Sequence, residues 1–240
     1  MRPKELQRRY YAATAARYDE MHVREEDEQY RALRYLSSFL PLLGISTVLY
    51  VGCGTGPALK RLREMGVVAR GVEPVSALIA QAIDRNGVPK EMMVCASGDR
   101  LPFRDGAFDA VTAFALFHHV KRPDPIVLEM IRVARKAVFI SDTNRFGRGG
   151  YLNRLTKLLI YKLRLWRPAY FIRTLGRGYQ WSEGDGVSYS YSVFDSYDLL
   201  AKWAEAVVLI PTKGGPASLS WAHPLLTSSH ILLCALKKGP

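Results

Sequence analysis

The chain has 240 residues, of which 48% are hydrophobic and 23% are charged, and this suits one globular domain with a large core. No apolar stretch reaches the roughly 18–20 residues of a transmembrane helix, and the basic start lacks the apolar core of a secretory signal. The formal net charge of +12 predicts an anionic partner, although a solvated basic face is an equally simple interpretation.

Residues 1–43 are predicted to be helical, because apolar and aromatic side chains recur at three- and four-residue intervals. After this segment, strand-like apolar runs alternate with helical runs. The predicted strands of this part are Thr47–Val51, Val67–Val72, Met92–Ala96, Phe108–Phe114 and Ala137–Ser141. The predicted helices are Pro57–Met65, Ser76–Asn86 and Asp124–Ala134. Such alternation indicates a parallel sheet with helices on both faces.

The composition changes after Asp142. Residues 143–182 contain nine Lys or Arg residues and no Asp or Glu, with aromatic residues interleaved. The α/β pattern then resumes with a helix over 196–205 and strands over 206–211 and 230–236, which a Gly/Pro/Ser-rich loop would join as an antiparallel pair at the sheet edge.

The predicted fold is therefore α/β: a Rossmann-like, doubly wound, seven-stranded, mostly parallel sheet with an antiparallel edge strand and an inserted helical lid. We expect one domain over 1–240. Its parts are a helical cap (1–43), a cofactor-binding core (44–142), an acceptor-site insertion (143–193) and a C-terminal helix with edge strands (194–240).

The most informative motif is the glycine-rich turn Gly52-Cys53-Gly54-Thr55-Gly56, which follows the first strand, together with Glu73, which ends the second. Glycines let the backbone approach a ligand, and a carboxylate one strand away can accept hydrogen bonds from two ribose hydroxyls. A Walker loop would need Gly-Lys-Ser/Thr, and a dinucleotide-binding turn would need glycine at the position of Pro57. The pattern instead favours a nucleoside that carries a single carboxylate near a helix N-terminus.

The run Val48–Gly56 resembles the first motif of class I S-adenosylmethionine-dependent methyltransferases. Four more stretches match that family in order and spacing, and one of them is similar to the N-terminal Y-x-x-x-A-x-x-Y-D segment of the ubiquinone/menaquinone methyltransferase-like (methyltransferase type 11) subgroup. They are Tyr11–Asp19, Gly71–Pro74, Ser97–Phe103 and Phe108–Val120. The chain departs from the family before its fifth strand, where Ala134-Arg135-Lys136 stands in place of Pro-Gly-Gly.

The resemblance implies that the cofactor is S-adenosylmethionine and that Glu73 binds its ribose. It further implies that Asp99 accepts the adenine N6 amine, that carbonyls at the end of the fourth strand face the methionine amine, and that two tyrosines cover the site. The implied cofactor-binding residues are Tyr11, Tyr18, Gly52, Cys53, Gly54, Gly56, Glu73, Pro74, Ser97, Gly98, Asp99, Arg100, Phe114 and Ala115.

A sulfonium is already an activated methyl donor, so the protein must mainly align the acceptor, exclude water and in some cases remove a proton. His118 is the candidate catalytic base because it follows the fourth strand, and a structural histidine is the alternative. His119 is expected to pack beneath the same loop. Asp142, Tyr189 and Tyr191 are further candidates. No metal site is predicted, and three widely spaced cysteines indicate a reducing, cytoplasmic environment rather than disulfides.

The basic, aromatic stretch 143–182 is the candidate acceptor lid. It could hold an anionic or lipid-linked small molecule, lie on a membrane surface as an amphipathic helix, or line an RNA path. Residues 179–193 are dense in hydroxyls and acids, which suits a sugar-containing acceptor or simply a polar β-hairpin. The predicted function is methyl transfer to a small molecule, with an oxygen acceptor favoured over nitrogen or carbon. An RNA methyltransferase and a non-catalytic S-adenosylmethionine-binding subunit are the alternatives.

Overall fold

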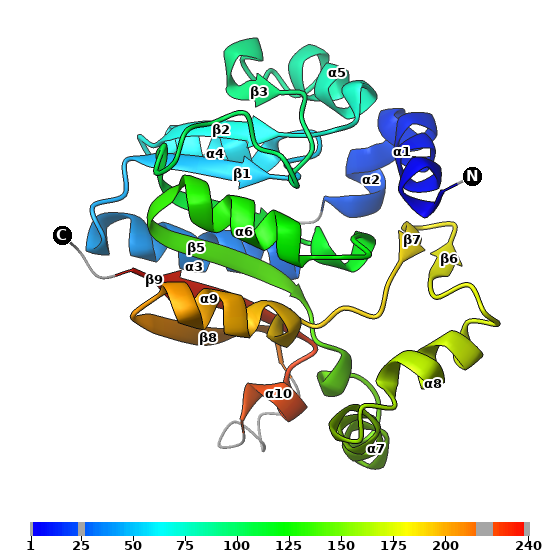
Figure 1. Cartoon of the computed structure of the whole chain (residues 1–240). Coiled ribbons are helices and arrows are strands. Elements are labelled where there is room, and N and C mark those ends of the chain that lie inside the picture. Colours follow the sequence, from blue (N-terminus) through cyan, green and yellow to red (C-terminus); the bar gives the residue numbers. More distant parts are fainter. Residues whose placement is uncertain (1, 24–26, 215–222, 238–240) are drawn as a thin grey trace.

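The structure is a computed structural model that describes residues 2–23, 27–214 and 223–237. At its centre is a seven-stranded sheet with the strand order β3-β2-β1-β4-β5-β9-β8 (Figure 1). The strands are β1 (Thr47–Val51), β2 (Val68–Val72), β3 (Met93–Val94), β4 (Phe108–Phe114), β5 (Ala134–Thr143), β8 (Ala206–Lys213) and β9 (His230–Leu236). All seven predicted strands are present, and the predicted α/β fold class is confirmed.

The five strands from β3 to β5 run parallel to one another. β9 is antiparallel to both of its neighbours, β5 and β8. The reversed strand therefore lies one place in from the sheet edge, and the predicted antiparallel pair is β8 with β9. Part of the Gly/Pro/Ser-rich connection between them, residues 215–222, lies outside the described residues.

Helices cover both faces of the sheet because successive strand residues point to opposite sides. Val48 and Tyr50 belong to the core that packs against α3 (Glu28–Leu42) and α4 (Pro57–Glu64). On the other face, the core includes Leu49 and Val51 from the same strand. It packs against α6 (Asp124–Val133) and α9 (Tyr197–Trp203). α5 (Ser76–Asp84) and the short helix η2 (Lys90–Met92) connect β2 to β3.

The missing Pro-Gly-Gly turn is replaced by a change of register. α6 ends at Val133, and β5 begins at the next residue, Ala134. Phe108 of β4 pairs with Ala134, whereas Ala110 pairs with Ala137. The additional residue on β5 forms a bulge that absorbs the helix-to-strand transition. This is why the strand starts three residues earlier than the predicted Ala137.

The N-terminal segment folds as separate short helices before α3. These are α1 (Pro3–Thr14), η1 (Ala15–Arg17) and α2 (Tyr18–His22). Figure 1 shows α1 beside the small hairpin β6–β7 (Gln180–Ser182 and Gly186–Ser188). We call α1, η1 and α2 the N-terminal cap, because they lie over the ends of β1 and β2 where the glycine-rich turn begins.

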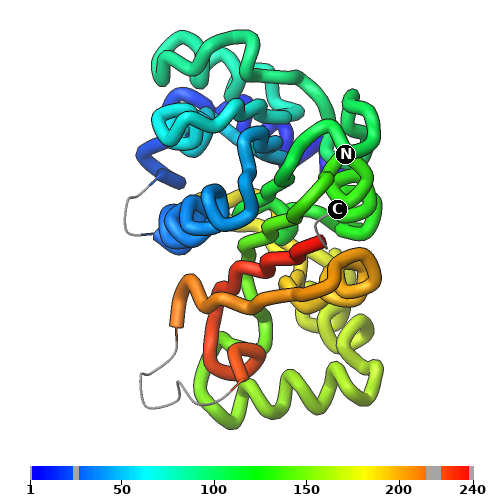
Figure 2. The backbone as a smooth tube through the Cα atoms, turned by 90° about the vertical axis from the view of Figure 1, so that its left-hand side faces the viewer, coloured from blue at the N-terminus to red at the C-terminus, as the bar shows by residue number. Residues whose placement is uncertain are grey.

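The insertion after β5 contains η4 (Arg145–Gly147), α7 (Tyr151–Lys162), α8 (Trp166–Arg173) and then the hairpin. The α7–α8 pair lies at the end of the molecule opposite β3 and α5 in both views of the chain (Figures 1 and 2). The remaining short helices are η3 (Phe117–His119), η5 (Val193–Ser196) and α10 (Pro224–Thr227). Across the ranges that the structure describes, no helix combines the length and apolarity needed to span a bilayer.

Candidate functional site

The glycine-rich turn adopts a conformation that other residues rarely take. Gly52, Gly54 and Gly56 have φ of +72°, +55° and +78°, in the left-handed region that side chains with a Cβ atom disfavour. The amide of Gly52 donates to the carbonyl of Val72 at 2.8 Å. The turn is therefore tied to the end of β2, and this brings it next to Glu73.

Glu73 is almost fully buried, with 5% of its surface exposed. Its two carboxylate oxygens accept hydrogen bonds from the amide of Gly54 at 3.1 Å and from the amide of Val75 at 3.0 Å. Burial raises the pKa of Glu73 to about 7, although these two amides oppose the shift. The protonated and ionised forms of this carboxyl group are thus about equally populated near neutral pH, at the place where the sequence predicts ribose binding.

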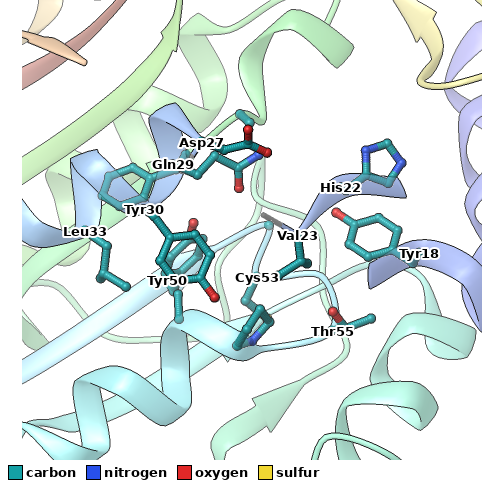
Figure 3. A pocket seen from close by; sticks show the side chains of 15 residues that line it. Tyr18, His22, Val23, Asp27, Gln29, Tyr30, Leu33, Tyr50, Cys53 and Thr55 are labelled. Atoms are coloured by element: carbon teal, nitrogen blue, oxygen red, sulfur yellow. The ribbon is translucent and has the colours of Figure 1, made fainter. Parts of the chain in front are cut away.

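Tyr18 of α2 covers the glycine-rich turn. Its hydroxyl lies where a Cβ atom on Gly54 would meet it at 3.0 Å. Burial, followed by the nearby Glu73 carboxylate, raises the pKa of Tyr18 well above its ordinary value. A cavity of about 70 Å³ lies beside this ring and reaches Gly52 and Ala115. Figure 3 shows that its wall is formed by side chains from α2, from α3 and from the turn after β1.

Polar contacts fasten the N-terminal cap at two places. Asp19 accepts a short hydrogen bond from the Thr55 hydroxyl and a bond of 2.8 Å from the Asn86 amide. Lys4 forms a 3.0 Å ion pair with Asp99, the residue expected to bind adenine, and its ammonium group also lies 3.3 Å from the Ser97 hydroxyl oxygen. The cap therefore engages both the methionine end and the adenine end of the predicted cofactor site.

A second cavity, of about 500 Å³, lies beyond the carboxyl ends of β4 and β5. This is the edge at which ligands bind in parallel α/β sheets. Tyr11, Tyr18, Ala115 and His118 line it, together with residues from α7, α8 and the β6–β7 hairpin. Ala115 has φ of +50° and lines both cavities, so a strained backbone position stands where the two spaces meet. We call this second space the acceptor cavity.

Two histidines and two carboxylates form one wall of the acceptor cavity. Nδ1 of His118 lies 2.8 Å from Asp142, and its Nε2 lies 3.4 Å from Asp185. Nε2 of His119 lies 3.3 Å from the same Asp185 and 2.8 Å from the Tyr11 hydroxyl. Burial lowers the pKa of His118, but the carboxylates of Asp142 and Asp185 outweigh it and raise that pKa to about 10.

Another part of the wall of the acceptor cavity is cationic. Arg148, Lys157 and Arg173 line it from the segment around α7 and α8, and none of the three has an acidic partner within the described ranges. Lys157 donates to the carbonyls of Arg145 and Arg148. Its pKa is lowered by burial and then by repulsion from neighbouring arginines, Arg173 foremost among them. Several positive charges, without an ion-pair partner in the part of the chain that the structure describes, thus face a cavity that Glu28, Asp142 and Asp185 also line.

The structure divides the predicted site residues between two neighbouring spaces. Tyr11, Tyr18, Ala115 and His118 meet at the acceptor cavity, whereas Gly54 and Glu73 meet under the cap. The other predicted positions do not line the acceptor cavity. Gly52, Cys53 and Phe114 line the small cavity beside Tyr18 instead, and Gly56 precedes α4. Pro74 is partly buried just after β2, and Ser97, Gly98, Asp99 and Arg100 lie in the loop after β3.

Sequence reasoning missed several contributors. Asp185 was only one acid in a polar stretch, and nothing in the sequence placed it against His118. Lys4 lies outside every motif, and the motif Tyr11–Asp19 includes Asp19 without specifying its contacts. His22 also lines both cavities, and its buried Nε2 has no hydrogen-bond partner in the described part of the chain. The one usable signal was the composition of 143–182, which has many Lys and Arg residues and no Asp or Glu, and it indicated the cationic wall.

Comparison with known proteins agrees with this architecture. Residues 49–140 match the family model described as a methyltransferase domain. An uncharacterized methyltransferase of Mycolicibacterium gilvum is 36% identical over 89 residues, which are 37% of this chain and 35% of that protein. One from Mycobacterium tuberculosis is 29% identical over 183 residues, covering 69% of this chain and 70% of that protein. The chain spans only 30–35% of the length of several such curated relatives.

Solved structures show the same fold. Magnesium protoporphyrin IX methyltransferase from Synechocystis, crystallised with bound S-adenosylhomocysteine, superimposes with a TM-score of 0.63 at 13% sequence identity. The superposition covers 99% of this chain and 100% of that one. The matched residues 49–140 therefore form a class I S-adenosylmethionine-dependent methyltransferase domain, and the sheet built around them has the fold of these solved structures.

Proposed function

We propose that this protein transfers the methyl group of S-adenosylmethionine to an oxygen atom of a small, anionic acceptor. The observation that carries the proposal is the acceptor cavity of about 500 Å³, which adjoins the glycine-rich turn through Ala115 and is lined by Arg148, Lys157 and Arg173, cations without an ion-pair partner among the described residues. Its volume falls within the range typical of small-molecule sites.

The cofactor would lie along the glycine-rich turn, with its ribose on Glu73 and its sulfonium directed past Ala115 toward the acceptor cavity. Supporting this orientation, Ala115 follows β4 and is shared by both cavities. The Tyr18 ring lies against Gly54, and Lys4 forms an ion pair with Asp99. Cofactor entry therefore requires the N-terminal cap to shift. Once returned, the cap would exclude water from the sulfonium, which methyl transfer requires.

The acceptor's negative charge follows from the cationic wall. Arg148 and Arg173 reach the cavity from the lid, and Lys157 lies between them with a lowered pKa. A carboxylate, phosphate or sulfate group would relieve this mutual repulsion and form charge-assisted hydrogen bonds. Anchoring one end of the acceptor in this way would direct its other end toward β4 and the sulfonium.

The reaction itself places few demands on protein chemistry. The acceptor oxygen attacks the methyl carbon, the carbon–sulfur bond breaks, and its electron pair remains on sulfur. The protein aligns the three atoms and supplies a dry cavity. His118 stays the predicted catalytic residue, since it lies on the wall beside Ala115. With Nδ1 directed at Asp142 and Nε2 at Asp185, it can act on an acceptor only through Nε2, which at a pKa of about 10 carries a proton at neutral pH and so donates a hydrogen bond to the acceptor oxygen.

A radiolabelled methyl-transfer assay tests the proposal. Acceptors are offered in matched pairs, in which one member carries an acid group and the other carries the corresponding amide. We expect turnover with the acid and at least about tenfold lower kcat/KM with the amide, equivalent to one charge-assisted contact. Arg148→Ala should remove that discrimination, whereas Arg104→Ala, on an exposed loop outside the cavity, should preserve it.

Each other outcome identifies an alternative. Methyl incorporation into total RNA, with steep salt dependence and none into small acids, would replace the proposal with an RNA methyltransferase. Calorimetric binding of S-adenosylmethionine without turnover on any acceptor class would favour a non-catalytic cofactor-binding subunit.

A further inference from the structure

We propose that His118, His119 and Asp185 form a binding site for a divalent transition-metal ion on the wall of the acceptor cavity. One ring nitrogen of each histidine and a carboxylate oxygen of Asp185 all lie within 4.8 Å of one another. His118 and His119 belong to η3, while Asp185 lies in the turn of the β6–β7 hairpin. The fold thus brings together ligands that are far apart in the sequence.

The hydrogen bonds on the other side of each imidazole determine which nitrogen is free. Nδ1 of His118 faces the Asp142 carboxylate at 2.8 Å, and Nδ1 of His119 faces the Val187 carbonyl at 2.6 Å. Carboxylates and carbonyls only accept hydrogen bonds, so both Nδ1 atoms must carry a proton. In the neutral rings, both Nε2 atoms are consequently unprotonated and available as ligands.

This arrangement needs a positive charge between the rings. Two neutral imidazoles would direct their Nε2 lone pairs at the Asp185 oxygens, which is repulsive. Two protonated rings with centroids 4.0 Å apart would instead repel each other. In the metal-free chain a proton on Nε2 of His118, whose pKa is raised to about 10, supplies this charge; a divalent cation would displace that proton and satisfy both lone pairs and the carboxylate together. The orientation of ligating histidines by a carboxylate or a backbone carbonyl on Nδ1 is the usual outer shell of such sites.

The distances suit a small ion with bonds of about 2.0–2.1 Å, which places neighbouring ligand atoms about 3.3–3.4 Å apart in a tetrahedron. Oδ2 of Asp185 lies 3.4 Å from Nε2 of His118, and Oδ1 lies 3.3 Å from Nε2 of His119, so each ring faces a different oxygen of the carboxylate at a distance of this size. Two nitrogens and one oxygen are the donors that zinc, cobalt and ferrous ions accept readily, and magnesium favours oxygen alone.

Three protein ligands leave at least one coordination position open, and all three line the acceptor cavity. The Tyr11 hydroxyl lies 2.8 Å from Nε2 of His119, where an ion would bind that nitrogen, and it would move aside when an ion binds. If the proposed function holds, an acceptor hydroxyl bound at the open position would have its pKa lowered. Its proton would pass to solvent, and the resulting alkoxide or phenolate oxygen would form the new bond to the methyl carbon as the carbon–sulfur bond breaks.

The experiment uses the full chain without an affinity tag, stripped with a chelator and dialysed. Co²⁺ is added, and its visible ligand-field absorption is recorded. Zn²⁺ affinity is then measured by competition with a chromophoric chelator. We expect one ion per chain, tetrahedral or five-coordinate cobalt intensity, and no displacement by excess Mg²⁺. Neither readout depends on methyl transfer, so failure of the proposed function would leave this result intact.

Variants locate the ion. Asp185→Asn and His119→Gln should each weaken Zn²⁺ binding by more than about 100-fold, and the outer-shell change Asp142→Asn by about 10–100-fold. Asp99→Asn and Cys95→Ser, which alter a carboxylate and an exposed thiol outside the cluster, should bind as the unchanged chain does. Circular dichroism of each metal-free variant verifies folding, and only folded variants are compared.

Several results would overturn the proposal. The first is the absence of Zn²⁺ and Co²⁺ uptake up to millimolar concentrations in the folded chain. The second is uptake that survives in Asp185→Asn and His119→Gln but is lost in Cys95→Ser. Equal competition by Mg²⁺ would also contradict a site built on two imidazoles.

Discussion

The strongest test of the cofactor site is the pH dependence of cofactor binding. Glu73 has a raised pKa of about 7 in the unliganded protein. Ribose hydroxyls donate hydrogen bonds, so the ionised carboxylate is the form that should bind them. Ionisation increases as the pH rises through 7, and binding should therefore strengthen in that direction. At pH 6 about a tenth of the molecules are ionised, and at pH 8 about nine tenths, which corresponds to a roughly tenfold tighter Kd, or about 1.4 kcal/mol.

Isothermal titration calorimetry with S-adenosylhomocysteine at pH 6, 7 and 8 measures this effect. The amine of the ligand also titrates, so Glu73→Gln provides the matched reference that retains the ligand contribution. We expect the variant to bind more weakly than the parent at pH 8 and to show no tenfold improvement between pH 6 and 8. The reasoning is refuted if both proteins show the same dependence, or if Glu73→Ala leaves the affinity at pH 8 unchanged instead of weakening it by about 1.5–3 kcal/mol.

Other predictions concern the cap and the lid. Gly54→Ala places a methyl group against Tyr18 at a φ of +55°, whereas Gly66→Ala, at +78°, meets nothing within 4 Å. Both should lower the Tm by about 2–8 °C through backbone strain of about 1–2 kcal/mol, but only Gly54→Ala should abolish cofactor binding in calorimetry. Asp19→Ala removes two hydrogen bonds to the core, so amides of α1 and α2 should exchange hydrogen at least about tenfold faster by mass spectrometry, with β4 unaffected. Arg173→Ala should raise the KM of an acidic acceptor about tenfold and leave the Kd of S-adenosylhomocysteine unchanged. An equal loss in both constants would place Arg173 outside the acceptor site.

The sequence was sufficient for the sheet because its signals are local. Buried parallel strands appear as apolar runs such as Phe108–Phe114, and the glycine spacing after β1 marks a backbone that must turn sharply. The first and last residues of the strands were harder to predict. The start of β5 depends on a bulge opposite Phe108, which is a property of strand pairing and not of the residues at Ala134 themselves.

The site was only partly predictable because its closest contacts join distant segments. His118 and Asp185 are 67 positions apart, and Lys4 and Asp99 are 95 apart. No periodicity or motif relates such pairs, since their meeting depends on how the cap and the hairpin dock on the sheet. The family resemblance named positions on β1, β2 and β4, where the backbone is shared by the fold. It had no information on the hairpin, which belongs to the insertion.

The docking of α1 against the hairpin has a kinetic consequence. The Gln7 side chain donates to the carbonyl of Asp185 at 3.0 Å and accepts from the amide of Val187. The cap is thus hydrogen-bonded to the hairpin that borders the acceptor cavity, so outward movement of one must either break these bonds or carry the other with it. Under the proposed function, admission of the two reactants would therefore be coupled. Departure of the spent nucleoside should then loosen the methylated product as well.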